Sequence, residues 1–137
     1  MKSHPMRALS VCFVMVTGLF MAACNKQQAT ADLSDPSGSY VLISVNGLPL
    51  PASVSHGGAT MQVRSGTFTI NPGGTCSSKI ILVPPMGTEV AREVSATYIK
   101  EGSTLTMQWK DAGKTVGTLN GKIFTMENEG MSFVYWK

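Results

Sequence analysis

The sequence contains few of the side chains that form disulfides, metal sites or catalytic centres. It has three cysteines and two histidines, and beyond residue 24 only Cys76 and His56 remain. One cysteine cannot form an intramolecular disulfide, and one cysteine with one histidine cannot complete a tetrahedral zinc site. A single histidine also lacks the acid and the nucleophile that hydrolytic catalysis requires. We therefore predict no metal, no cofactor, no catalytic residue and no enzymatic activity.

Cys76 and His56 both have a simple structural interpretation. Because the chain has no disulfide framework, its stability must come from a packed core, and Cys76 is then a small buried hydrophobic side chain. The alternative is a reactive or intermolecular thiol. His56 lies in the glycine-rich stretch 53–58, which predicts a surface loop.

The chain also has little net charge. Without Lys2 and Arg7, which belong to the leader described below, nine basic and eight acidic side chains remain. A charge balance this close to zero gives no case for nucleic-acid binding or electrostatic steering. The acidic side chains fall mainly in turns and on outer faces, and no paired-carboxylate arrangement can be placed. We therefore predict that nucleic acid is not a partner.

After Gly38 the sequence is poor in helix formers and rich in glycine, threonine, serine and valine. Apolar and polar side chains alternate, and a period of two is typical of strands. The clearest case is 103–110, where Leu105, Met107 and Trp109 alternate with polar residues. This pattern predicts strands at 40–45, 59–64, 67–71, 75–83, 92–100, 103–110, 115–119, 122–127 and 131–136.

Turn signals connect these strands. Ser65-Gly66 predicts a turn that joins 59–64 and 67–71 into a hairpin, and Asn46-Gly47 ends the first strand. Pro49 and Pro51 exclude a regular central strand over 48–52. The spacing of the strands therefore indicates a meander of consecutive hairpins.

Such a meander leaves two open edges unless the sheet closes on itself. An eight-stranded barrel encloses an interior that side chains can fill, or that can hold one small ligand. We therefore predict an all-β domain over 38–137, a small antiparallel up-and-down β-barrel of about eight strands, in which 131–136 pairs with the first strand. The strand count, the meander order and the segment YVLISVNGLPLPA at 40–52 resemble uncharacterised lipocalin-like envelope proteins of bacteria.

The first 23 residues have the features of a secretory signal peptide. Lys2 and Arg7 form a cationic start, an uncharged apolar run covers 8–23, and the small residues Ala22 and Ala23 precede Cys24. The run is shorter than the roughly 20 apolar residues of a typical transmembrane helix.

Met21-Ala22-Ala23-Cys24 resembles the lipobox of bacterial lipoproteins. The resemblance implies cleavage before Cys24, a diacylglycerol on its sulfur and acylation of the new amino terminus, and multiple acyl chains anchor a protein stably to a bilayer. Asn25 in place of aspartate favours the outer membrane, with the protein facing the periplasm. The polar residues 24–37 are then a lipidated cysteine followed by a flexible tether. An ordinary signal peptide or an uncleaved anchor is the alternative.

Two hypotheses for function follow from this architecture. In the first, the lipid-anchored barrel binds a small apolar ligand in its mouth, lined by Phe68, Tyr98 and Trp109, although these side chains fit a filled core equally well. In the second, the barrel is filled and the protein is an interaction module, such as an inhibitor of an envelope hydrolase or an assembly accessory, acting through loops at 48–58 or 84–89. A cavity of about 300 Å³ or more favours the first.

Overall fold

The computed structural model describes residues 35–137. The predicted signal peptide 1–23, the predicted acylation site Cys24 and most of the predicted tether 24–37 lie outside these residues. All regular structure within the described residues is β-strand, which confirms the all-β prediction. A helix long and apolar enough to cross a membrane is not found in this part of the chain.

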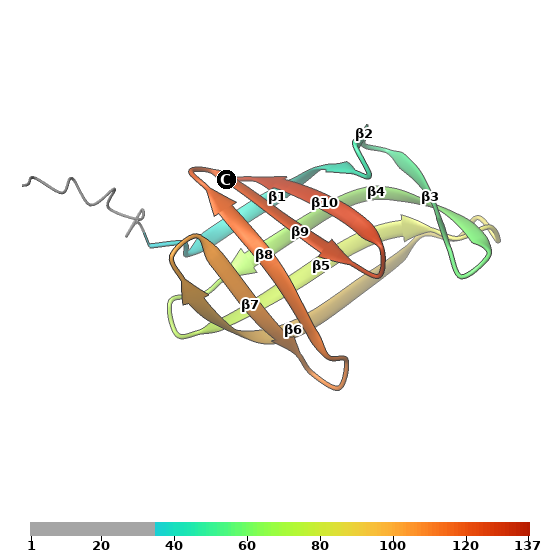
Figure 1. Ribbon diagram of the computed structural model, residues 1–137. Helices are drawn as coiled ribbons and strands as arrows, with labels where there is room; N and C mark the ends of the chain where they lie inside the picture. The colour runs from blue at the N-terminus through green and yellow to red at the C-terminus, as the bar shows by residue number, and fades with distance from the viewer. Residues whose placement is uncertain (1–34) are drawn as a thin grey trace, which may run out of the picture.

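Ten strands follow one another along the chain: β1 (Gly38–Val45), β2 (Leu48–Pro49), β3 (Ala52–His56), β4 (Ala59–Ile70), β5 (Thr75–Val83), β6 (Val90–Glu101), β7 (Thr104–Trp109), β8 (Lys114–Asn120), β9 (Ile123–Asn128) and β10 (Met131–Trp136). β1 and β4 to β10 form a closed antiparallel barrel (Figure 1). Each strand from β4 to β9 pairs with the next, β10 pairs with β1, and β1 pairs with β4. The predicted up-and-down barrel and the pairing of its last strand with its first are therefore confirmed.

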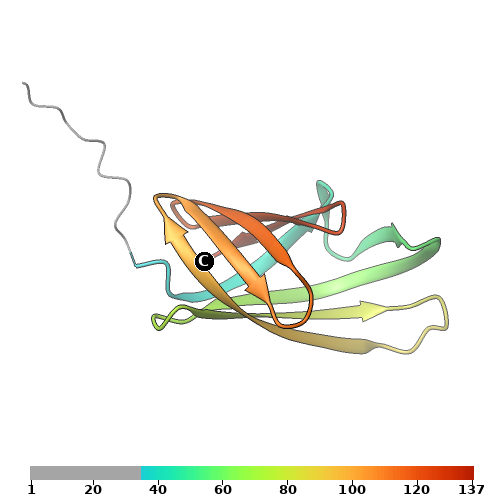
Figure 2. The same ribbon diagram turned by 60° about the horizontal axis from the view of Figure 1, so that its bottom comes forward.

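The barrel wall is continuous at one end and separates at the other. β1 pairs with β4 only over Gly38–Val41 and Thr67–Ile70. Further along, β1 pairs with β2, and β4 pairs with β3. Figure 2 shows β4, β5 and β6 continuing past β7 to β10 at this second end. We call the end where β1 meets β4 the closed end, and the opposite end the open end.

The predicted turn at Ser65-Gly66 is wrong, because β4 runs without interruption through both residues. The local irregularity is instead a β-bulge between Val63 and Ser65 in the pairing with β5. Glycine at position 66 serves close packing, since a Cβ there would lie 2.8 Å from Leu42 Cδ2. Glycine therefore does not always indicate a turn, because inside a strand it often marks a close approach between two segments.

The predicted loop at 53–58 is also wrong in its first part. Ala52–His56 forms β3 and pairs with β4, and Gly57-Gly58 makes the two-residue connection. Both glycines have positive φ, as type I′ hairpin turns require. The buried side chains of Ala52 and Val54 alternate with exposed serines, so the signal for a strand was present in the sequence.

Aromatic side chains fill the closed end of the barrel. The fully buried ring of Phe68 lies 4.6 Å from the ring of Phe124 and 5.7 Å from that of Tyr135, measured between centroids. Tyr40 meets Phe124 edge-on at 6.0 Å. Arrangements of this kind contribute about 0.5–1.5 kcal/mol per pair beyond the area they bury. This half of the barrel is therefore a solid core.

Cys76 belongs to the same core and is 1% exposed. Burial raises the pKa of its thiol to about 11, so the thiol keeps its proton at neutral pH. The thiolate is the nucleophilic form of cysteine. Its position therefore agrees with a buried hydrophobic side chain rather than a reactive thiol.

Candidate functional site

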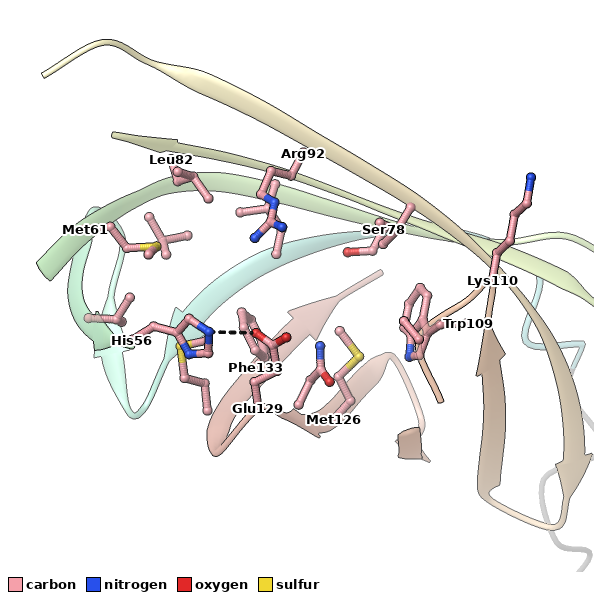
Figure 3. Close-up of a pocket in the computed structure, with 17 residues that line it drawn as sticks. His56, Met61, Ser78, Leu82, Arg92, Trp109, Lys110, Met126, Glu129 and Phe133 are labelled. Carbon is pink, nitrogen blue, oxygen red and sulfur yellow. Dashed lines mark ion pairs between the residues drawn. The ribbon is translucent and has the colours of Figure 1, made fainter. Parts of the chain in front are cut away.

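A cavity of about 250 Å³ lies at the open end of the barrel. Side chains from β3 to β6 line one side of it, and side chains around the ends of β7, β9 and β10 line the other (Figure 3). The volume lies just below the roughly 300–1,000 Å³ of typical small-molecule sites. Since a water molecule takes up about 30 Å³ in the liquid, the space corresponds to roughly eight water-sized groups. It therefore has room for a small ligand, and a larger one would extend through the mouth into solvent.

Inward-facing side chains of three strands give the cavity an apolar wall. Met61 and Val63 come from β4, and Ile80 and Leu82 come from β5. Residues two apart in a strand lie on the same face, so each pair continues the inner face of its strand. Val94 of β6 extends this wall and is 52% exposed although it faces inward. Apart from Val63, which is buried, the wall is thus an apolar surface that the barrel covers only in part.

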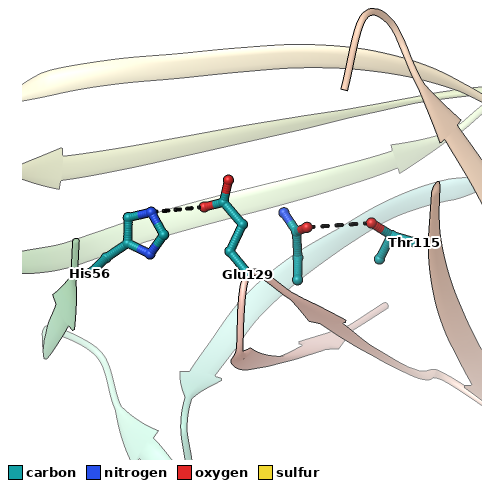
Figure 4. A network of polar contacts seen from close by, with 4 residues as sticks. His56, Thr115 and Glu129 are labelled. Atoms are coloured by element: carbon teal, nitrogen blue, oxygen red, sulfur yellow. Dashed lines mark hydrogen bonds and ion pairs between the residues drawn. The ribbon is translucent and has the colours of Figure 1, made fainter. Parts of the chain in front are cut away.

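Trp109 lies on the cavity wall with its indole N–H already hydrogen-bonded. Its Nε1 donates to Thr115 Oγ1 at 2.8 Å. The Thr115 hydroxyl in turn donates to the Asn128 side-chain oxygen at 3.4 Å (Figure 4). This chain of bonds fixes the indole ring, which is 6% exposed and packs edge-on against Phe68, so that a small part of the ring faces the cavity.

Ser78 places its hydroxyl in the cavity lining, near the hydroxyl of Tyr135. Ser78 is 3% exposed. The buried Tyr135 hydroxyl has no hydrogen-bond partner among the described residues, although the Ser78 hydroxyl is near enough to affect it. Burial raises the pKa of Tyr135 to about 12, and the neighbouring Ser78 opposes this shift. A buried hydroxyl without a partner costs about 1–3 kcal/mol.

His56 and Glu129 face each other at the cavity mouth. His56 ends β3, and Glu129 lies in the turn between β9 and β10. Their Nε2 and Oε2 atoms are 3.3 Å apart, and they form an ion pair when His56 is protonated (Figures 3 and 4). The side chains are 40% and 56% exposed, and exposed pairs contribute only about 0–1 kcal/mol. The contact matters because it links β3 to the β9–β10 turn at the mouth.

Two cationic side chains complete the lining, Arg92 of β6 and Lys110 just after β7. In Figure 3 the Arg92 guanidinium turns toward the cavity, and the Lys110 ammonium points away from it. Neither forms an ion pair with another described residue. Glu129 is the one carboxylate among the lining residues, and it already contacts His56. Arg92 is therefore the cation that faces the cavity without an ion-pair partner among the described residues.

The three residues predicted to bind a ligand lie in different parts of the barrel. Trp109 lines the cavity. Phe68 is fully buried in the aromatic core. Tyr98 donates its hydroxyl proton to the Asn71 carbonyl oxygen at 2.7 Å, beside the turn between β4 and β5 at the closed end. Of the three, Trp109 is the one placed where a ligand in this cavity would touch it.

Ser78, Arg92 and Glu129 line the cavity but were not predicted as site residues. Ser78 stands two residues before Ile80, and Arg92 two before Val94, so strand alternation alone puts both on the inner face. Glu129 lies in a turn with no periodic signal. That it reaches His56 is visible only in the folded barrel.

A second hollow of about 290 Å³ lies at the closed end. Its walls include Asp35 and Pro36 and the three lysines Lys100, Lys122 and Lys137. It borders the first residues that the structure describes, and it has no continuous apolar strand face. We therefore take the open-end cavity as the candidate site.

The described residues contain no group of three or more histidine, cysteine, aspartate or glutamate side chains placed to hold a metal ion. No protein-family model, curated protein or solved structure matches the chain. The chemistry of the cavity itself is therefore the basis for assigning a function.

Proposed function

We propose that this protein binds a small, mainly apolar ligand in the open-end cavity and does not alter it chemically. One observation carries the proposal: inward-facing side chains of β4, β5 and β6 form an apolar wall that is open to solvent, with Val94 52% exposed. Covering apolar surface is favourable by about 25 cal/mol per Å². A ligand that covers this wall would gain that free energy, and the indole of Trp109 adds a rigid aromatic contact.

We also propose that acyl chains on Cys24 anchor the protein to the bacterial cell envelope, at the outer membrane and facing the periplasm. The lipobox-like segment supports this. β1 starts with Gly38 at the closed end, whereas the cavity lies at the open end. A chain arriving from an anchor at Cys24 therefore joins the barrel at the end opposite the cavity. This arrangement supports ligand exchange with the periplasm rather than with the bilayer.

Binding of the neutral fluorescent probe N-phenylnaphthylamine tests the cavity. We expect the probe to become fluorescent on binding, and Val94→Trp to weaken binding at least about tenfold, since the larger ring takes up cavity space; tenfold corresponds to about 1.4 kcal/mol. The measurement is a fluorescence titration of the purified full chain carrying Cys24→Ser, so that no acyl chain competes.

Ile99→Trp is the matched control for this titration. Ile99 lies on the same strand, faces outward and is 67% exposed. It should leave probe binding unchanged. If the wild-type cavity binds no probe, or if both tryptophan variants bind it as the wild type does, the ligand-binding proposal fails.

One observation favours the alternative of a protein-interaction module. Val41, Trp136 and Ile123 are neighbours across β1, β10 and β9 on the outer face of the barrel. Their side chains are 57%, 56% and 42% exposed. Contiguous exposed apolar side chains are typical of protein-binding surfaces. The alternative would be favoured if a partner protein needed these three side chains for binding and the cavity bound no probe.

A further inference from the structure

The inner faces of β5 and β6 form layers that run from the cavity mouth inward. Leu82 pairs with Val90 in the outermost layer, Ile80 with Arg92 in the next, and Ser78 with Val94 below that. The innermost layer pairs Cys76 with Ala96, both buried. Arg92 is therefore the one charged side chain on this inner face, which is apolar apart from Ser78, and it lies one layer above the deeper part of the cavity.

The Arg92 guanidinium has no carboxylate partner. Arg64 pairs with Glu89, with 3.9 Å between Nη1 and Oε2, and Glu129 contacts His56, whereas no described carboxylate lies within ion-pair distance of Arg92. Figure 3 shows its guanidinium turned toward the cavity between Leu82 and Trp109. An arginine on an apolar inner face thus presents its donors to whatever occupies the cavity.

We infer that the ligand is an amphiphile with a short apolar chain and a carboxylate head, and that Arg92 binds the head. This inference rests on the proposed ligand-binding function. The guanidinium geometry matches a carboxylate through two parallel hydrogen bonds, which a neutral head group cannot form. The head remains near the mouth, where water also reaches it.

The same layers indicate where the apolar chain of the ligand would lie. Below Arg92 the cavity is lined by Val94, Trp109 and Met126, and the chain would cover the exposed part of Val94. A volume of about 250 Å³ corresponds to roughly eight water-sized groups, which sets the chain length to be tested. Octanoate and octanol provide a matched pair with the same chain length and different head groups.

The test is displacement of N-phenylnaphthylamine from the full chain carrying Cys24→Ser by octanoate and by octanol at neutral pH, where octanoate is ionised. We expect octanoate to bind about tenfold more tightly than octanol, because one pair of charge-assisted hydrogen bonds contributes a free energy of about that size. Arg92→Gln should reduce the two affinities to within about twofold of each other. Arg92→Lys should keep part of the preference, because it retains the charge without the paired donors.

Arg64→Gln is the matched control, because it removes the same charge from a residue that does not line the cavity. It should leave the preference for octanoate intact. Equal affinities for the two ligands in the wild type, or a preference that survives Arg92→Gln, would overturn this inference while probe binding still supports the cavity function. Absence of probe binding would overturn both.

Discussion

Replacing Gly117 by alanine is expected to lower the free energy of unfolding by about 3 kcal/mol, the upper part of the usual range for overpacked cores. Gly117 lies in β8 opposite Leu105 and Met126. A Cβ at this position would lie 2.6 Å from Phe124 Cζ and closer still to Phe124 Cε2, with Met107 Cε at 3.3 Å. Phe124 is fully buried within the aromatic core, so its ring has nowhere to move.

Urea unfolding followed by tryptophan fluorescence measures this change. Gly73→Ala is the control, because no atom lies within 4 Å of its added Cβ and its φ is not positive. It should be neutral or slightly stabilising. In a double-mutant cycle, Phe124→Leu should recover part of the loss caused by Gly117→Ala. A Gly117→Ala variant as stable as the wild type would contradict the packing described for the closed end.

Burial of the Tyr135 hydroxyl is expected to lower the free energy of unfolding in alkaline solution. Its pKa rises from 10.0 to about 12 in the folded protein, because burial disfavours the phenolate. Between these pH values the folded protein keeps a proton that the unfolded chain has lost. Stability therefore falls as pH rises from about 10 to about 12, by about 2–3 kcal/mol in total for this group.

Tyr135→Phe should remove this part of the alkaline loss. At pH 7 it should also leave stability unchanged or raise it by about 1 kcal/mol, since the hydroxyl has no hydrogen-bond partner among the described residues. Tyr98→Phe makes the same chemical change where the hydroxyl donates to the Asn71 carbonyl, and should be destabilising at pH 7. Unfolding curves at pH 7 and across pH 9–12 compare the variants. The account of Tyr135 fails if its phenylalanine variant loses stability at high pH as steeply as the wild type.

Strand alternation predicted most of the barrel because each strand has one buried face. β5 and β10 have the predicted bounds, and the rows that contain Leu105, Met107 and Trp109 face inward as expected. The errors in the predicted strands occur at glycines, because glycine is found both in turns and inside closely packed strands. Gly66 lies within a strand and makes room for Leu42, whereas Gly57-Gly58 turns the chain after a strand that was not predicted.

The site was harder to predict than the fold, because alternation gives the face of a side chain and not its depth. Phe68 and Trp109 both face inward, yet one is sealed in the aromatic core and the other lines the cavity. Depth depends on where β1 separates from β4 and on how far β4 to β6 continue past the rest of the barrel. Those features arise from pairing between segments far apart in the sequence.

Methyl NMR during titration with N-phenylnaphthylamine tests the cavity most directly, because the probe's rings shift nearby methyl signals. We expect the largest shifts at Val94, Leu82 and Ile80 on the apolar wall. Ile70 and Leu105 in the closed-end core, and Ile99 and Val116 on the outer face, should stay unchanged. Shifts centred on the outer face, or no shift at Val94 and Leu82 while the probe binds, would contradict the assignment of the open-end cavity as the binding site.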